Sequence, residues 1–434
     1  MITGSPSVPI ARTHTPRIGN IPGVGIDGAL VSFEKSAPAF SSYGKEQSLN
    51  APCSISSTWA YSLALQYLVD HEKHHVRVSG TKCCFWAQEN EQHTVLFSDL
   101  LTSPQPDEVR KFLLSPWTGI GIPREEAQRD RFFAVTLAGN SGRIAVRHWM
   151  QCPLDKAIEN LNLWFKDLQL EIPPMPAKQK TKTSDKSGKE PSAPLSLFRL
   201  ACTTVREAKD LQPEVPAMLY RAALEGSCPS VALLKPILHR LHSRLVKDEN
   251  YRVVFDESRF ALLKLIVNRV NRNRKESDME IQSKLTADTT DTAYNCGRLL
   301  AVFDALQQSA HRAGNPGGRL NNTIAEKYFG SASGSPSSAF AILWRLHQHH
   351  LKKLRQSGKE SAAASYRAQI AEISTRFQMK NADGAPVFPR TLTLMEQARF
   401  ALGFYQQEAA RMEAIRKWKE EQGAKAGAES EILT

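Results

Sequence analysis

One polar segment divides the chain into two parts of different character. Residues 173–194 read PPMPAKQKTKTSDKSGKEPSAP, in which Met175 is the only large apolar side chain. Such a segment buries too little apolar surface to offset the entropy of ordering it, so we expect a flexible linker. The sequence therefore predicts a first domain over residues 1–172 and a separate region after residue 194.

The first part mixes short strands, turns and few helices, which predicts a mixed α/β domain. The strings FFAVTLAG and RIAVRHWM flank the turn NSG and are rich in apolar and β-branched residues, as is typical of a β-hairpin. Strand alternation places Arg143, Arg147 and Trp149 on one face. Ile144 and Val146 then point the other way, toward a core.

Two more elements are expected before this hairpin. The string TKCCFWAQ predicts a strand. Residues 56–69 predict a helix, because Trp59, Leu63 and Tyr67 recur at spacings of four.

The second part alternates helical periodicity with breaks at Gly and Pro, which predicts a mainly α-helical region. Helices are expected over residues 197–211, 217–225, 231–246, 257–274, 290–313, 321–328, 337–356, 361–377 and 394–421. We divide this region into a basic helical part, residues 195–278, and a C-terminal helical bundle, residues 279–434, which carries apolar stripes of its own. The predicted fold class is α+β: a mixed α/β part with a hairpin, then a mainly helical part ending in a bundle.

The charge of the chain favours a polyanionic partner. There are 56 Lys and Arg against 44 Asp and Glu, a net charge of +12. Ribosome-associated proteins, peripheral membrane proteins and many enzymes share such a balance, so charge alone does not decide among them. The densest basic stretch, residues 235–275, holds 11 Lys or Arg and four acidic residues.

This basic stretch supplies the first candidate nucleic-acid-binding residues. Arg240, Arg244 and Lys247 share one helical face at spacings of four and three. Arg269 and Arg272 gather near the C-terminal end of the next helix, where cations also offset the helix macrodipole. The macrodipole accounts for about one charge, so a nucleic-acid role is favoured for the cluster.

Two further groups in the first part are candidates. In SYGKEQSLNAP, Gly44 permits a tight turn while Lys45, Gln47 and Asn50 offer a cation and two amides to a nucleic acid. The alternative is a surface loop in which Asn50 and Pro52 cap the following helix.

Arg143 and Arg147 are four residues apart in a strand, roughly 13 Å, which suits a pair of phosphate contacts. A solvated strand face is the alternative for them.

Nothing in the sequence predicts a metal, a cofactor or a catalytic centre. The histidine clusters His71, His74, His75 and His347, His349, His350 have no Cys or carboxylate at ligand spacing, and the second is expected to be solvated or to face a polyanion. Phosphate-binding loops, nucleophile elbows and paired nuclease carboxylates are absent. Seven cysteines without a repeated spacing predict reduced thiols in the cytoplasm. No apolar run is long enough to cross a membrane.

Several long strings resemble the large subunit of the type I-C CRISPR Cascade. ITG and PIARTH are followed in order by LVSFEKSAPAFSSYGKEQSLNAPCS, LAGNSGRIAVRHWM, MLYRAALEGSCP, AYNCGRLLAVFDALQ, IAEKYFGSASGSPSSAF, RLHQHHLKKL and FPRTLTLMEQARFALGFYQQ. The resemblance implies a non-enzymatic subunit that binds guide RNA, target double-stranded DNA and the displaced single strand. It also implies contacts with other Cascade subunits and with a recruited helicase-nuclease that cleaves the target.

The resemblance carries two further expectations. Family members normally have a sizeable segment before the ITG block, so the resemblance implies a member that lacks its N-terminal part. Recognition of the PAM, the motif beside the target, is the role that this absence is expected to affect. In the family a small subunit can arise by internal initiation, and Met279 is placed where such a start would leave the bundle whole.

Two rival functions remain open at this stage. One is a stand-alone metal-dependent nuclease with an unrecognised site. The other is a protein-only adaptor, which would show no salt-dependent affinity for nucleic acid.

Overall fold

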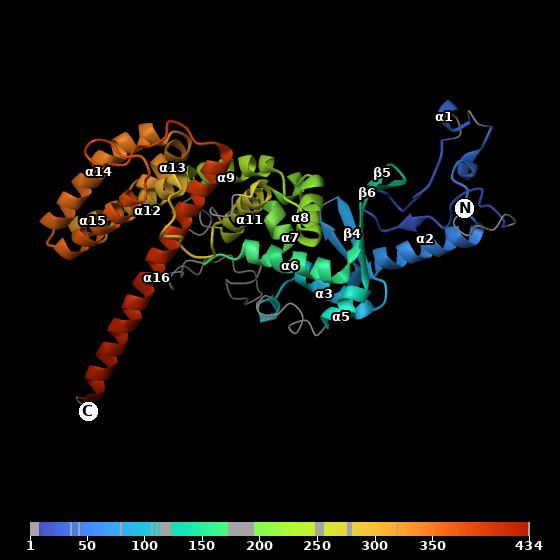
Figure 1. Ribbon diagram of the computed structural model, residues 1–434, viewed down its shortest axis with the longest axis horizontal. Helices are drawn as coiled ribbons and strands as arrows, with labels where there is room; N and C mark the ends of the chain where they lie inside the picture. The colour runs from blue at the N-terminus through green and yellow to red at the C-terminus, as the bar shows by residue number, and fades with distance from the viewer. Residues whose placement is uncertain are drawn as a thin grey trace. The chain divides into compact units, whose positions relative to one another are not determined.

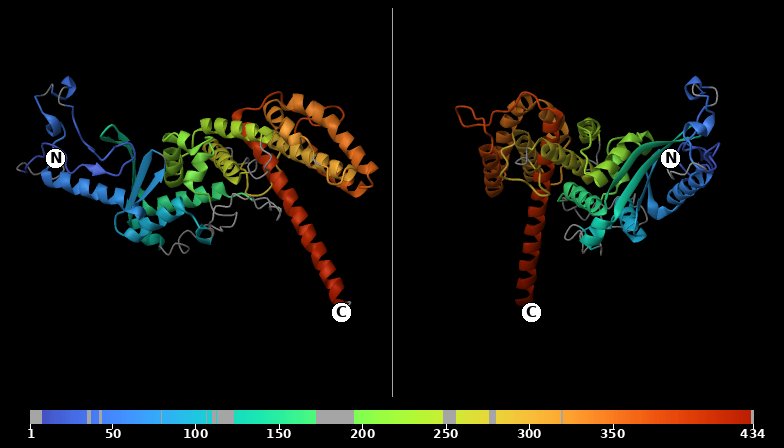
Figure 2. Two further views of the ribbon diagram at one scale, coloured as in Figure 1. Left: turned by 180° about the vertical axis from the view of Figure 1, so that it is seen from behind. Right: turned by 45° about the vertical axis from the view of Figure 1, so that its right-hand side comes forward.

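The computed structural model describes residues 8–34, 37–41, 44–78, 80–105, 107–109, 112, 123–171, 195–247, 256–275, 280–318 and 320–432. They belong to two compact units (Figures 1 and 2). The first comprises Met1–Lys166 and Ala193–Ser227, and the second comprises Asp167–Ser192 and Cys228–Thr434. The α+β class predicted from the sequence is confirmed. The expected linker, residues 173–194, lies outside the described residues.

The first unit is built on a four-stranded antiparallel sheet in the order β3-β4-β5-β6. Its strands are β3 (His75–Val78), β4 (Thr81–Ala87), β5 (Arg131–Asn140) and β6 (Arg143–Pro153). Strands β5 and β6 form the predicted hairpin, and Ser141 and Gly142 of its turn both have positive φ, 48° and 82°. Two consecutive residues with positive φ suit a tight hairpin because their twist matches that of the strands.

A β-bulge changes the faces of this hairpin. Thr136 pairs with His148 and the next residue, Leu137, pairs with Val146, so Arg147 has no partner across the strands. Trp149 pairs with Val135 and therefore lies on the same face as Val146. The predicted grouping of Trp149 with Arg143 is wrong, because one extra residue reverses the alternation.

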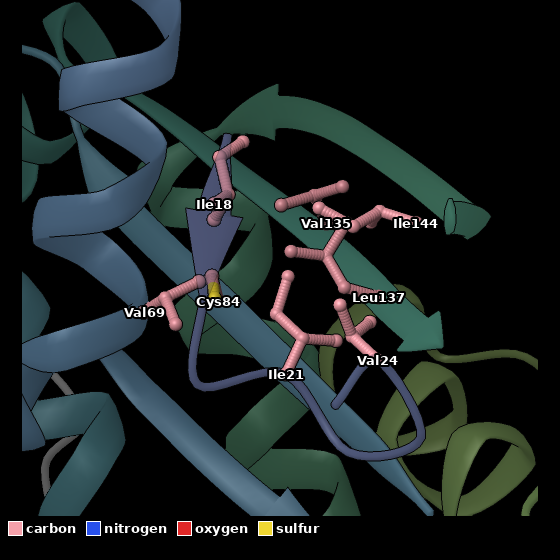
Figure 3. Packing of buried hydrophobic residues seen from close by; sticks show 8 residues of the cluster. All are labelled: Ile18, Ile21, Val24, Val69, Cys84, Val135, Leu137 and Ile144. Atoms are coloured by element: carbon pink, nitrogen blue, oxygen red, sulfur yellow. The ribbon is translucent and has the colours of Figure 1, made fainter. Parts of the chain in front are cut away.

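One face of the sheet carries a core completed by the N-terminal segment and a helix. A two-stranded ribbon, β1 (Ile18–Gly19) and β2 (Asp27–Gly28), and α2 (Ile55–Asp70) lie over this face. Their buried side chains meet those of β4, β5 and β6 (Figure 3): Ile18, Ile21, Val24, Val69, Cys84, Val135, Leu137 and Ile144. The expected helix over residues 56–69 is confirmed, and Ser54 caps it by accepting a hydrogen bond from the Ser57 amide at 3.1 Å.

The opposite face of the sheet packs against further helices of the same unit. These are α3 (Glu91–Thr102), α5 (Arg124–Arg129), α6 (Leu154–Leu168), α7 (Leu197–Cys202) and α8 (Glu214–Glu225), with the short α1 (Pro38–Ser41) preceding α2. Phe132 of β5 lies 4.5 Å from Phe97 of α3 between ring centroids, and Phe85 of β4 lies 6.3 Å from Tyr220 of α8. Residues 195–227 thus share a core with the sheet.

The second unit is helical. It contains α9 (Leu234–Lys247), α11 (Glu257–Arg274), α12 (Thr292–Gly314), α13 (Ile324–Gly334), α14 (Pro336–Gln356), α15 (Glu360–Thr375) and α16 (Leu394–Ile432). Each corresponds to an expected helix, although α16 continues to residue 432, beyond the predicted residue 421. In the first unit α7 is shorter than expected: the hydroxyls of Thr203 and Thr204 bond to carbonyls of the preceding turn and the helix ends at Cys202.

Two glycines allow α12 and α16 to pack closely. A Cβ at Gly297 would lie 1.9 Å from the Phe400 carbonyl oxygen, and one at Gly403 would lie 2.1 Å from that of Tyr294. The first half of α16 is largely buried, whereas residues 414–422 are exposed. In Figures 1 and 2 the second half of α16 extends beyond the other helices of its unit.

Candidate nucleic-acid interface

The outer face of α14 presents a row of cations that no acidic residue interrupts. The helix contains Arg345, Lys352, Lys353 and Arg355, and neither Asp nor Glu occurs among its 21 residues. Arg345, Lys352 and Arg355 are exposed. Seven residues separate Arg345 from Lys352, so these two cations are about 10 Å apart along the helix axis.

The helix fixes this row because its other face is buried. Phe340, Leu343, His347, Leu351 and Leu354 point into the bundle at spacings of three and four. The side chains of Arg345, Lys352 and Arg355 form no hydrogen bond or ion pair with other residues in the described part of the chain. A phosphate could therefore approach them without breaking an internal contact. We call Arg345, His349, Lys352 and Arg355 the α14 face.

The histidines of α14 do not all belong to this face. His347 is buried and stacks on Phe303, with ring centroids 5.0 Å apart and planes 5° apart. The expectation that it is solvated is therefore wrong. Burial, followed by the neighbouring cations and histidines, lowers the pKa of His350 to about 4, so that ring is neutral at pH 7. His350 therefore adds no positive charge to α14 at pH 7.

The basic stretch singled out from the sequence is partly internal. Arg259, Lys264 and Arg269 are buried along α11. Arg269 Nε donates to the Asp167 carboxylate at 2.9 Å, and Arg272 binds the other oxygen of the same group. Arg269, a candidate for nucleic-acid binding, is buried, and its guanidinium neutralises a buried carboxylate. Arg272 is about a quarter to a third exposed, with its charge directed at the same carboxylate.

Lys264 belongs to the same internal cluster. Its ammonium donates to the Asp167 backbone carbonyl at 2.9 Å, and burial lowers its pKa to about 8. Of the residues proposed on α9, Arg240 is partly exposed. The backbone of Arg244 and Lys247 is helical as predicted, and their side chains lie outside the described residues.

Arg143 and Arg147 are both exposed on β6, in different settings. Arg143 forms an ion pair with Glu34 at 3.5 Å, and both side chains are about half exposed. Arg147 is the residue of the bulge and makes no ion pair or hydrogen bond with any residue that the structure describes. Bulges commonly redirect a side chain, so Arg147 is the freer of the two cations.

The side-chain amide of Asn50 stabilises the loop at residues 44–50 from within. Gly44 and Gln47 have positive φ, 68° and 46°, and Gln47–Asn50 form a 3-10 turn. The Asn50 side chain donates to the Gln47 carbonyl at 3.1 Å. Asn50 does not cap the following helix, since Ser54 does, so the capping alternative is wrong. Lys45 is exposed at the surface of this loop.

Comparison with known proteins shows the family of this chain. A family model described as CRISPR-associated protein (Cas_Csd1) matches residues 1–412. The chain belongs to the Cas_Csd1 family. The resemblance to the type I-C Cascade large subunit is thereby confirmed. No curated protein matches the chain.

This Cas_Csd1 protein has no metal-binding cluster in the part of the chain that the structure describes: no three His, Cys, Asp or Glu side chains there form a group that could hold a metal ion. His74, from the first histidine cluster, is buried and bonds Glu91 at 3.0 Å. No helix in the described ranges is long and apolar enough to cross a membrane, and all seven cysteines are free thiols.

Sequence reasoning did not select the α14 face of this family member. The string RLHQHHLKKLRQ could have indicated this face, because it holds four Lys or Arg and no acidic residue. Charge density favoured residues 235–275 instead, because a count of cations does not separate those on the surface from those paired inside.

Proposed function

We propose that the chain is a non-catalytic, nucleic-acid-binding large subunit of a type I-C Cascade. The observation that supports this best is the α14 face, a row of exposed cations without an acidic neighbour on the helix. Most of the affinity of proteins for nucleic acid comes from such contacts with phosphates.

The proposed partners are the guide RNA, the target duplex and the displaced strand. In RNA-guided recognition the sequence is read by base pairing, so the protein supplies charge and shape to the backbone. An exposed row of Lys and Arg suits a single strand, whose phosphates it can follow without regard to sequence. We propose that the α14 face contacts the displaced strand. Lys45, Gln47, Asn50, Arg143 and Arg147 would contact nucleic acid near the PAM-side duplex.

The double substitution Arg345→Ala with Lys352→Ala tests the α14 face. The slope of log affinity for single-stranded DNA against log salt should become shallower by about 1.4 if each cation contacts one phosphate. The matched control is Arg416→Ala with Lys417→Ala on α16, which removes the same charge from cations that are paired with Glu413 and Glu420. Equal effects of the two doubles would mean that only net charge matters.

A second set of variants tests the residues proposed on α9. Replacing Arg240, Arg244 and Lys247 by Ala should lower the slope for DNA by up to about 2.7 if each contacts one phosphate of a duplex. Unchanged affinity at every salt concentration, with an unchanged helical circular dichroism spectrum, would exclude these three residues from the binding site.

The nuclease alternative is tested directly. The purified chain is incubated with single- and double-stranded DNA in magnesium or manganese, and we expect no cleavage. Cleavage that disappears when one carboxylate is replaced would overturn the non-catalytic assignment. Binding that does not respond to salt would instead favour the protein-only adaptor.

A further inference from the structure

Helix α2 in the first unit has an inverted distribution of side chains. Its sequence, ISSTWAYSLALQYLVD, contains no charged residue before Asp70. Thr58 and Ser62 are buried, whereas Trp59, Leu63 and Tyr67 are each about half exposed. Isolated exposed apolar residues are ordinary, but a continuous stripe of them marks an interaction surface.

An apolar groove lies between α2 and the sheet, on the side of the helix away from Trp59 and Leu63, and only Tyr67 of the stripe reaches it. The groove has a volume of about 760 Å³ and lies within the first unit. One wall is formed by Tyr61, Leu65 and Leu68 of α2, and the other by side chains of the sheet that include Val146 and Trp149.

Trp149 is held in place while its ring remains open to solvent. It lies edge-on to Trp86, with ring centroids 5.7 Å apart, and Trp86 stacks on Phe133 at 5.3 Å. Trp149 and Val146 are both about half exposed. A fixed, accessible indole is the kind of anchor that dominates the energetics of protein interfaces.

The charge of the groove argues against a nucleic acid. No Lys or Arg is among the residues that line it, although the chain as a whole carries +12. The acidic residues that line it are Glu89 and Glu91. Glu91 accepts hydrogen bonds from Tyr67 and His74, and Glu89 is exposed. Phosphates would be repelled here, whereas a Lys or Arg at the end of an apolar segment would be attracted.

We propose that this groove binds an apolar segment of another Cascade subunit, with a basic residue of that segment facing Glu89 and Glu91. Ile55, Trp59 and Leu63 lie on the opposite side of α2 and are not part of this site. The proposal deepens the proposed function, because it names the surface by which the chain joins the complex.

Three single substitutions in the full chain test this interface. Ala64→Glu places a charge on the α2 wall of the groove, Trp149→Glu places one on the sheet wall, and Glu89→Arg reverses the charge at its rim. Each is coexpressed with the other Cascade subunits, and the amount of chain that copurifies with a tagged partner is measured. We expect each variant to reduce recovery at least tenfold, with its melting temperature within a few degrees of the wild type.

The matched control is Trp418→Glu on α16, a tryptophan of similar exposure in the second unit. It should assemble normally. Equal losses for Trp418→Glu and Trp149→Glu would overturn the proposal, since they would show a general response to a new surface charge. Normal recovery of all three groove variants would overturn it as well.

Two further measurements separate this interface from the proposed nucleic-acid function. The isolated groove variants should bind single-stranded DNA with wild-type affinity and salt dependence. Lost DNA binding with intact assembly would make the groove a nucleic-acid site and overturn the proposal. A chain that dimerises alone in sedimentation, and loses the dimer but not assembly in Ala64→Glu, would identify a second copy as the occupant. Failure of the α14 variants alone would leave this interface standing.

Discussion

At the scale of single residues, Asp167 keeps two arginines of α11 inside the second unit. Its carboxylate is 2% exposed and binds both Arg269 and Arg272. Removing one partner of a buried ion pair leaves an uncompensated charge in a region of low polarity. The cluster is therefore structural. If the two arginines turned outward, the buried Asp167 carboxylate would be left without a partner.

The substitution Asp167→Asn tests this role. Asparagine keeps the volume and removes the charge, so we expect the free energy of unfolding to fall by about 3–5 kcal/mol in urea denaturation. Asp288→Asn is the control, since Asp288 is 87% exposed and forms a surface pair with Arg376 at 2.7 Å. Its loss should cost less than about 1 kcal/mol. Similar losses in both variants would contradict the structural role assigned to Asp167.

Asp304 predicts a dependence of stability on pH. One of its carboxylate oxygens accepts a hydrogen bond from the Ala325 amide at 2.7 Å, and burial raises its pKa to about 6. Between about pH 4 and pH 6 the folded chain then holds a proton that the unfolded chain has released, so this group's contribution to stability is lost as the pH rises through 6.

Asp304→Asn should remove that contribution. We expect the free energy of unfolding, measured at pH 4, 5, 6 and 7, to decline less between pH 4 and pH 6 in this variant than in the wild type. Asp383→Asn, at an exposed loop position, should keep the wild-type slope. A wild-type slope in Asp304→Asn would show that another group controls this pH range.

At the scale of elements, the contact between α12 and α16 depends on two glycines. The Cβ of Gly297→Ala would overlap the Phe400 carbonyl oxygen, and backbone cannot move aside as a flexible side chain can. We expect Gly297→Ala to lower the free energy of unfolding by roughly 2 kcal/mol or more, as overpacked sites do. Differential scanning calorimetry would show the lower melting temperature.

Gly330→Ala in α13 is the matched control for this contact. Its added Cβ would meet only His242 at 4.0 Å, and alanine favours a helix over glycine by about 1 kcal/mol. This variant should be neutral or more stable. Equal destabilisation by both variants would contradict the close-packing explanation, because the added methyl group at Gly330 has open space around it.

Local elements followed from the sequence, whereas their faces did not. The spacing of Trp59, Leu63 and Tyr67 correctly predicted a helix, since periodicity is a local property. Which side of α2 meets the core depends on the sheet beneath it, and the side that is buried includes Thr58 and Ser62. The bulge at Arg147 likewise depends on pairing with β5, so strand alternation alone misplaced Trp149.

At the scale of the whole molecule, the predicted linker is tested by limited proteolysis. Residues 173–194 contain several lysines and almost no apolar side chain, so trypsin should cut there before it cuts any described helix. Mass spectrometry of the first fragments would locate the site. Early cleavage inside a described helix, with this segment intact, would place the boundary elsewhere.

The site was predictable only where it did not depend on distant partners. Arg269 is 102 residues from Asp167 in sequence, and nothing local reveals that the two meet. The family resemblance indicated nucleic acid as the partner, and the net charge of the chain indicated a polyanionic partner. The structure adds which cations face outward, and this moves the best candidate from α11 to α14.

The smallest part of the second unit that folds alone depends on which helices complete its core. The sequence favours residues 279–434, and Met279 itself lies outside the described residues. The structure shows that the helices before it share the core of the bundle. Phe260 of α11 stacks on Tyr405 of α16 with ring centroids 4.2 Å apart, and His242 of α9 bonds Ser333 of α13 at 3.0 Å.

We therefore expect residues 228–434 to melt cooperatively and residues 279–434 to melt at a clearly lower temperature. The longer fragment should carry Arg269→Met, because Asp167 is absent from it and an unpaired buried guanidinium would mask the result. Circular dichroism during heating compares the two. Equal melting temperatures would mean that the bundle completes its own core from residue 279, and that a product of internal initiation would need no helix from the rest of the chain.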